Sequence, residues 1–255
     1  MATLPTMWTR FRAAGLVWPT LFALAALAVL LGLGTWQMSR KAWKDGLVAQ
    51  ITASTAAEPS PLGAREISSW LGSDAPHEYR RLKMTGAFVH AAERHVYAPR
   101  SQGQGWLVFT PLTVATAAEP VHVIVNRGWV PEHLKDPATR AKGQVSGPVE
   151  IVGLARRPEV PGAFTPTNDT ARNMWYWRDI RTMASGPPCV APSRCVTTFY
   201  LDAEAEPTNP GGWPRGGATN LVIPNRHLEY ALTWYGLAAT LVGVFSAFAW
   251  GRWRQ

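Results

Sequence analysis

The stretch that decides the fold is AAGLVWPTLFALAALAVLLGLGTW, at residues 13–36, which contains no charged side chain. A helix needs about 20 apolar residues to cross the roughly 30 Å hydrocarbon layer of a membrane. Arg10 and Arg12 precede the stretch, as basic residues also precede a signal peptide. The apolar run of a signal peptide is only about 7–15 residues long and ends at a small-residue cleavage site. This run is longer and ends in GLGTW, a poor cleavage site, so we expect an uncleaved membrane anchor.

A second apolar stretch, YALTWYGLAATLVGVFSAFAW, occupies residues 230–250. Indole rings favour the headgroup level of a membrane, and a tryptophan pair brackets each stretch: Trp18 with Trp36, and Trp234 with Trp250. Two spans place both chain ends on the same side of the membrane. Small residues at four-residue spacing predict that the two helices pack directly, through Ala28 and Gly32 of the first and Ala239, Gly243 and Ala247 of the second.

The chain has 255 residues, of which 16% are charged, and a net charge of +8. Soluble proteins carry about 25% charged residues, so a simple cytosolic protein is excluded. Half of the net charge comes from arginines just outside the apolar stretches: Arg10, Arg12, Arg252 and Arg254. The central segment has no Lys/Arg run of the length expected for a nucleic-acid patch. The sequence therefore predicts no nucleic-acid partner.

The middle of the chain reads mostly as β-structure, because short runs rich in β-branched and aromatic residues alternate with Gly, Pro and polar turns. The predicted strands are Arg80–Phe88, Arg94–Tyr97, Trp106–Thr113, Val121–Val130, Val149–Leu154 and Thr197–Leu201, with Trp175–Trp177 as a candidate. A short helix is predicted near Arg178–Ala184, and loops or linkers over Ala53–Pro76 and Ala203–Pro224.

The predicted fold class is a membrane protein in which two transmembrane α-helices flank a mainly antiparallel β domain, barrel- or sheet-like, with short helices. Five consecutive segments follow: an N-terminal tail (1–12), the first transmembrane helix (13–36), the exported mainly-β domain (37–228), the second transmembrane helix (229–250) and a C-terminal tail (251–255).

The chain has two cysteines, Cys189 and Cys195, in the Pro-rich segment GPPCVAPSRCV. A disulfide closing this loop fits an oxidising compartment, such as the periplasm, and places the large segment there. Two free thiols, or a copper- or zinc-binding pair, are the alternatives. Zinc would need two further ligands, and no Cys/His cluster lies nearby in the sequence.

The sequence offers no catalytic constellation. It contains no G-x-S-x-G, H-E-x-x-H, Walker loop or C-x-x-C motif. Five scattered histidines lie in or beside the β region and are expected to be surface or hydrogen-bonded residues: His77, His90, His95, His122 and His133. We therefore predict no catalytic residues and no enzyme.

Residues that suit a ligand gather where each helix leaves the membrane. After the first helix, Trp36, Arg40, Trp43 and Lys44 share one face if the helix continues; before the second, His227, Tyr230 and Trp234 share another. A metalloporphyrin needs an axial histidine, aromatic rings and basic groups near its propionates. Aromatic belts and basic flanks also occur at membrane interfaces without any ligand, so both interpretations stand at this point.

Five blocks closely resemble the Surfeit locus protein 1 family: LGLGTWQMSRKAWK, VNRGWVP, VEIVGLARRPE, FTPTNDTARNMWYWRDI and NRHLEYALTWYGLA. They occur in the family's order and span nearly the whole chain. The resemblance implies an assembly factor for haem-copper cytochrome c oxidase that binds haem a as transient cargo and assists catalytic subunit I. The family's suspected haem ligand falls on His227 and its associated aromatic on Trp234, and Tyr230 is expected to border the ring with Trp234. Arg40 and Trp43 are added from helix geometry alone.

Two other functions compete with the haem carrier: a scaffold that holds subunit I without binding haem, and a copper chaperone using Cys189 and Cys195. Subunit I and membrane lipid are the expected partners, and haem a synthase is a candidate partner. Too few residues precede the first helix for a clear amphipathic presequence. We therefore expect a bacterial inner membrane, both termini in the cytoplasm and the large domain in the periplasm.

Overall fold

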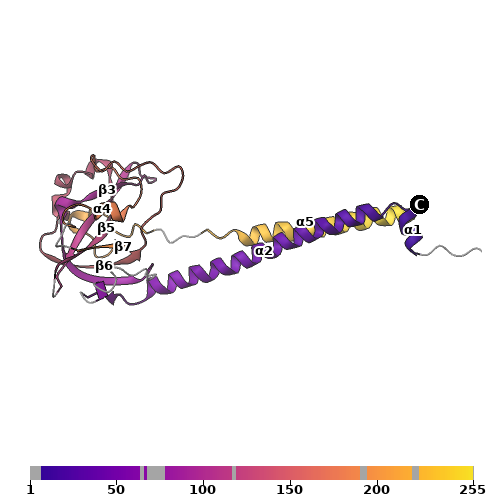
Figure 1. Cartoon of the computed structure of the whole chain (residues 1–255), viewed down its shortest axis with the longest axis horizontal. Helices are drawn as coiled ribbons and strands as arrows, with labels where there is room; N and C mark the ends of the chain where they lie inside the picture. Colours follow the sequence, from indigo (N-terminus) through magenta and orange to yellow (C-terminus); the bar gives the residue numbers. More distant parts are fainter. Residues whose placement is uncertain are drawn as a thin grey trace, which may run out of the picture. The chain divides into compact units, whose positions relative to one another are not determined.

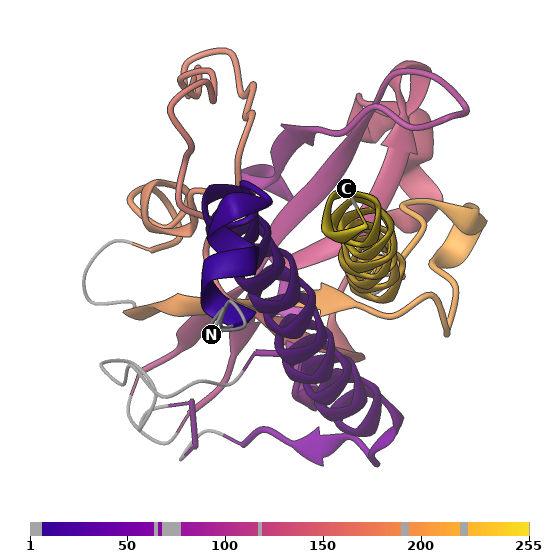
Figure 2. The same ribbon diagram turned by 90° about the vertical axis from the view of Figure 1, so that its right-hand side faces the viewer.

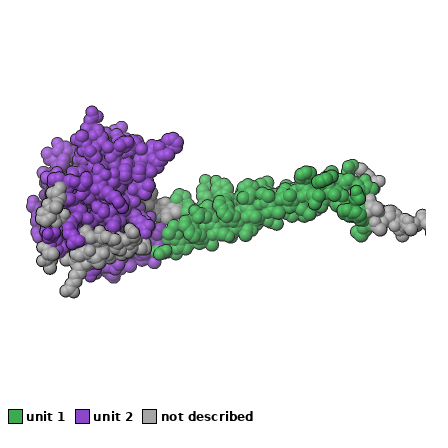
Figure 3. Space-filling model, in the orientation of Figure 1, with its two compact units in different colours: residues 1–50, 222–255 green, residues 51–221 purple. Residues whose placement is uncertain are grey.

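The computed structural model describes residues 7–63, 66–67, 78–116, 119–189, 194–219 and 224–254. The chain divides into two compact units, which we describe separately (Figure 3). Unit 1 comprises residues 1–50 and 222–255, and unit 2 comprises residues 51–221.

Unit 1 is built from helices: the short α1 (Met7–Ala13), the 40-residue α2 (Val17–Ala56) and the 27-residue α5 (His227–Trp253). Within this unit α2 and α5 run side by side in opposite directions (Figures 1 and 2). Both long helices are apolar and long enough to cross a membrane, with mean hydropathies of 2.1 and 1.5 in their most apolar windows. The two predicted apolar helices are therefore present.

The first helix is longer than the membrane requires. It continues through the polar segment after Trp36 to Ala56, so residues 53–56 of the predicted loop Ala53–Pro76 are helical, which corrects that prediction. The segment contains no proline, and an ion pair of 2.5 Å joins Lys41 to Asp45 at the favourable i,i+4 spacing. Much of the remaining loop, residues 64–65 and 68–76, lies outside the described residues.

The two long helices contact each other through residues that the small-residue pattern did not single out. A Cβ on the buried Gly34 would lie 2.6 Å from Cε1 of Tyr235, and Thr35 Oγ1 lies 3.3 Å from the Tyr235 hydroxyl. A Cβ on Gly32 or Gly243 would meet nothing within 4 Å. The predicted contact therefore exists, but the predicted stripes do not form it. The buried small residues of α5 recur at seven-residue spacing instead, at Ala231 and Ala238.

Unit 2 is a β-barrel. Five strands close a ring in the order β2-β6-β7-β5-β4, because β2 also pairs with β4. They are β2 (Arg81–Phe88), β4 (Gly105–Val114), β5 (Val121–Pro131), β6 (Pro148–Arg156) and β7 (Arg194–Ala203). Only β5 and β7 are parallel within this ring. A five-stranded Greek-key barrel of this kind is the architecture of OB-folds. Two further strands pair with members of the ring: β1 (Ser60–Pro61) with β2, and β3 (Arg94–Tyr97) with β4.

The barrel interior is filled by alternating aliphatic side chains, including Leu82, Leu112, Val123 and Leu201. A second cluster packs Trp175 and the helix α4 (Ile180–Met183) against the outer face of the sheet. The predicted strands are confirmed within a few residues at each end, except for the candidate Trp175–Trp177. Trp175 forms only an isolated bridge with Val96, and its ring is buried in the second cluster.

The segment predicted as the loop Ala203–Pro224 is mostly irregular where it is described. Its regular parts are the end of β7 and the single turn η4 (Pro210–Gly212). Residues 220–223 of this loop lie outside the described residues.

Candidate functional site

The predicted ligand, His227, is the first residue of α5. Its Nδ1 lies 2.7 Å from Oε1 of Gln37 on α2. An amide oxygen only accepts hydrogen bonds, so Nδ1 carries the proton and donates it to Gln37. In the neutral imidazole the other ring nitrogen, Nε2, then has a free lone pair, which is the form in which histidine binds a metal.

A short polar network holds the residues before α5 against α2. Asn225 donates a hydrogen bond of 2.7 Å to Asp45, and Lys44 donates to the backbone oxygen of Pro224. Asn225 Oδ1 also accepts from the backbone nitrogen of His227, at 3.4 Å. Because α2 continues past its apolar run, these contacts fix the start of α5 and thus the position of the imidazole.

The aromatic residues of the predicted site remain exposed. The side chains of Trp36, Trp43 and Tyr230 are more than half exposed, whereas Trp234 is half-buried. The guanidinium of Arg40 lies over the Trp43 ring, with Cζ 4.1 Å from its centroid. Because α2 continues past Lys44, the predicted helical spacing of these residues is kept, and the Lys44 ammonium donates to the Pro224 carbonyl.

The structure therefore brings together some predicted site residues and not others. Arg40 lies over the Trp43 ring, but the side-chain hydrogen bond of His227 goes to neither of them. The residue that does contact His227 is Gln37, which the sequence reasoning missed. Its signal was available, since Gln37 is the first polar side chain after the bracketing Trp36.

The chemistry of this site is that of a single protein ligand. No group of three or more His, Cys, Asp or Glu side chains among the described residues could hold a metal ion. A lone imidazole with a supported Nδ1 and a free Nε2 suits a metal that brings its own ligands, as a haem iron does. The residues present therefore fit an axial haem ligand better than a bare-ion site.

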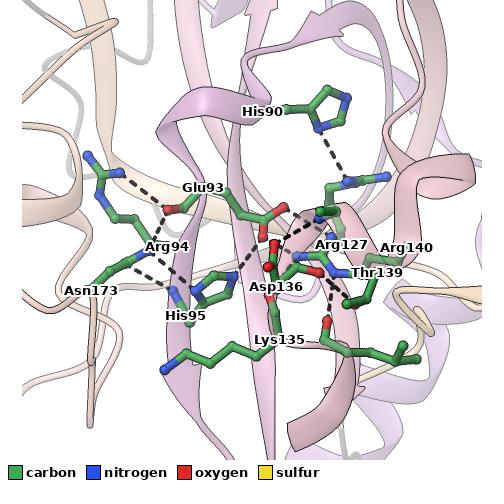
Figure 4. A network of polar contacts seen from close by, with 12 residues as sticks. His90, Glu93, Arg94, His95, Arg127, Lys135, Asp136, Thr139, Arg140 and Asn173 are labelled. Carbon is green, nitrogen blue, oxygen red and sulfur yellow. Dashed lines mark hydrogen bonds and ion pairs between the residues drawn. The ribbon is translucent and has the colours of Figure 1, made fainter.

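A second polar cluster lies in unit 2 and is centred on the buried Glu93 (Figure 4). His95 Nε2 donates to Glu93 at 2.7 Å, and Arg140 binds both carboxylate oxygens of Glu93. Burial alone would raise the pKa of Glu93, but the hydrogen bonds from His95 and Arg140 outweigh burial and hold its pKa below the usual value. Asn173 donates to the Glu93 backbone oxygen at 2.9 Å.

Arg127 lies beside this cluster and is 1% exposed. Its guanidinium donates to the Gly143 carbonyl and, at 3.2 Å, to Asn209, and it lies over the ring of Phe88. Burial lowers the pKa of Arg127 to about 10. His90 bridges Arg127 and the Val145 carbonyl, so His90 and His95 are hydrogen-bonded, as predicted for them. Glu93 is thus paired with Arg140 and His95, whereas Arg127 has no ion pair among the described residues and its Nε has no hydrogen-bond partner.

The block VNRGWVP has a structural explanation. Asn126 donates to the buried Asp202 at 2.7 Å, and Trp129 Nε1 donates to the Ala98 carbonyl at 2.8 Å. Gly128 has a φ of +121°, and a Cβ there would lie 1.9 Å from the Arg215 carbonyl oxygen. Only glycine fits where strand β5 and the segment at Arg215 approach this closely.

Cys189 and Cys195 are joined by a disulfide, with their Cα atoms 5.5 Å apart. A disulfide leaves no thiolate for copper or zinc, so this structure does not support the copper-chaperone alternative. Residues 190–193 between them lie outside the described residues.

Comparison with known proteins gives one family. The SURF1 family model matches residues 24–239. A SURF1-like protein of Monosiga brevicollis is 38% identical over 247 residues, covering 92% of this chain and 87% of that protein. Surfeit locus protein 1 of Takifugu rubripes is also 38% identical, covering 86% of this chain and 91% of that protein. The human protein of the same name is 36% identical, with coverages of 82% and 70%. Because the family model and these relatives match most of the chain, from one apolar helix into the other, the chain belongs to the SURF1 family.

Proposed function

We propose that this chain is an assembly factor for haem-copper cytochrome c oxidase, which binds haem a as cargo and assists its insertion into, or stabilisation in, catalytic subunit I. Membership of the family implies the assembly role. The observation that carries the haem-binding part is the hydrogen bond from His227 to Gln37. No catalytic step is assigned to this chain, and no nucleic acid is expected among its partners.

In this proposal His227 Nε2 is the axial ligand of the haem iron, because Gln37 holds the proton on Nδ1. Tyr230 and Trp234, on the first two turns of α5, would border the macrocycle. Arg40, held over Trp43, would place a positive charge near a propionate. Haem a would bring the iron and the macrocycle, and the protein side chains would hold the haem in place.

The expected location is a bacterial inner membrane, with α2 and α5 as its two spans. The long apolar helices and the disulfide between Cys189 and Cys195 support a large periplasmic domain. Both termini are then cytoplasmic. Besides membrane lipid, the expected partners are subunit I, which receives the cargo, and haem a synthase, which supplies it.

The test compares absorption spectra of the full-length protein with two histidine variants. The chain is co-expressed with the haem a biosynthetic enzymes, purified in mild detergent and measured as a reduced-minus-oxidised spectrum. We expect a haem a band in the parent that is lost in His227→Ala and retained in His133→Ala. His133 is a matched control because its imidazole is exposed on the turn η2 (Glu132–Leu134) of unit 2.

Each outcome decides between functions. A band of equal size in the parent and in His227→Ala would keep haem binding but reject this ligand. A colourless parent, in cells that demonstrably make haem a, would favour a scaffold that holds subunit I without binding haem.

A further inference from the structure

We propose that this chain binds the phosphate group of an anionic phospholipid in a basic cavity at the end of unit 1 far from His227. The cavity has a volume of about 550 Å³ and lies between α1 and the last turn of α5. Three arginines line it, Arg10, Arg252 and Arg254, together with Trp253 and the residues Ala13–Gly15. Figure 2 looks onto this end of the unit.

A glycine turn builds the cavity from distant parts of the chain. Gly15 has a φ of +69°, which lets the chain turn sharply after α1 before α2 begins. A Cβ on Gly15 would lie 3.5 Å from Nη2 of Arg252, so the turn sits directly against the end of α5. Arg10 and Arg252, which are far apart in sequence, thereby line one cavity.

No acidic side chain lies close in sequence to the arginines of this cavity. The sequence has no Asp or Glu before Asp45 and none after Glu229. Among the described residues the recorded ion pairs involve none of the three lining arginines, and Arg254 instead stacks on Trp250, with Cζ 4.6 Å from the ring centroid. Positive groups gathered in a concave site create a potential that attracts an anion.

The surroundings indicate which anion. The cavity lies at the ends of two apolar helices, beside Trp250, so a ligand there is at headgroup level with its acyl chains along the helices. Guanidinium groups bind phosphate oxygens in a bidentate manner, and basic pockets between membrane helices hold lipid head groups. A soluble phosphate ester has the same binding chemistry but no contact with the apolar helices.

Basic residues at a helix C-terminus also stabilise the helix dipole. That role applies equally to Arg12, which lies in the last turn of α1 but does not line the cavity. Arg12 therefore provides a matched control for charge and position.

The test is a native mass spectrometry titration of the full-length protein in mild detergent with phosphatidylglycerol or phosphatidylcholine. We expect one phosphatidylglycerol to bind more tightly than phosphatidylcholine. Arg10→Gln and Arg252→Gln should each weaken that binding about fivefold, which corresponds to the loss of one basic contact with an anionic lipid. Arg12→Gln should bind like the parent.

Three results would overturn the proposal. Equal binding of both lipids would mean that the cavity does not recognise the anionic head group. Equal weakening by Arg12→Gln would mean that only the general surface charge acts. Displacement of the bound phosphatidylglycerol by millimolar inorganic phosphate would assign the cavity to soluble phosphate compounds. None of these measurements depends on haem.

Discussion

At the scale of single residues, the hydrogen bond between His227 and Gln37 places a proton on Nδ1 of the imidazole. Without this bond His227 would resemble an ordinary histidine at a membrane interface. A hydrogen-bond acceptor at the ring nitrogen that does not bind the metal orients a metal-bound histidine and fixes its tautomer. The contact joins the first polar position after Trp36 on α2 to the first residue of α5. Gln37 is therefore a positioning residue for the proposed ligand.

Replacing Gln37 by Leu removes the acceptor of the Nδ1 proton and leaves the imidazole in place. We expect haem affinity to fall about 10–100-fold, the usual effect of losing a partner behind a metal-bound histidine. Gln37→Glu keeps an acceptor and should retain haem. Absorbance titration of the purified proteins measures the affinities. Unchanged affinity in Gln37→Leu, together with loss in His227→Ala, would show that the ligand is correct but its support is not.

Glu93→Gln tests the buried cluster of unit 2. The change leaves the Arg140 side chain, which is 2% exposed, without its counter-charge. We expect the free energy of unfolding of unit 2 to fall by about 3–5 kcal/mol, as when one partner of a buried ion pair is removed. Urea unfolding of the full-length protein, followed by near-UV circular dichroism, measures this. Glu119→Gln, at an exposed carboxylate, should change it little.

The same carboxylate predicts a pH dependence. The pKa of Glu93 is lower in the folded protein than its usual value, so its charge stabilises the fold above that usual value. This stability is lost as the pH falls through the lowered pKa. Unfolding midpoints measured across the acid range should therefore fall more steeply in the parent than in Glu93→Gln. Parallel curves would assign the acid sensitivity to other carboxylates.

At the scale of elements, the packing of α2 against α5 depends on the positions at which glycine leaves room for a side chain of the other helix. Gly34 is buried against the Tyr235 ring, whereas Gly32, two positions earlier, has open space at its Cβ position. Two glycines with the same helical context thus have different roles. The seven-residue spacing of Ala231 and Ala238 continues the contacting face along α5.

Gly34→Val should separate the two helices, because its Cβ would overlap the Tyr235 ring, whereas Gly32→Val should be tolerated. Thermal denaturation in detergent, followed by helical circular dichroism, should show a lower midpoint for Gly34→Val alone. Tyr235→Ala introduced with Gly34→Val should restore most of the loss by making room. Equal midpoints for the two valine variants would contradict this assignment of the contact.

At the scale of the whole molecule, the chain combines a helical unit and a barrel, and the division between them falls inside the continuous helix α2. A mainly polar helical segment after the apolar run therefore leads directly into the barrel unit. The predicted boundary at residue 37 lies within this helix as well. The two units carry different kinds of polar site: a haem-ligand candidate in unit 1 and the buried ion pair of Glu93 with Arg140 in unit 2.

The proposed topology makes a labelling prediction. Phe164 is fully exposed in unit 2, and Arg254 is exposed at the end of α5. In spheroplasts, an impermeant maleimide should label Phe164→Cys but not Arg254→Cys until the membrane is opened. The parent should remain unlabelled because its two cysteines form a disulfide. Labelling of Arg254→Cys in intact spheroplasts would reverse the orientation.

The sequence by itself determined the two apolar helices, most strands and the family, because these depend on local hydrophobic periodicity and on contiguous blocks. It did not determine that the strands close into a barrel. Closure depends on the pairing of β2 with β4, and no local pattern in either strand specifies that partner. Nor did it determine the contact of Gln37 with His227, or the gathering of Arg10 with Arg252, which belong to different helices. The sequence left the continuation of the helix past Trp36 conditional, because polar residues carry no membrane signal yet continue a helix. The tertiary structure decided these features, because pairing, tautomer and charge clustering depend on distances between residues that are remote in sequence.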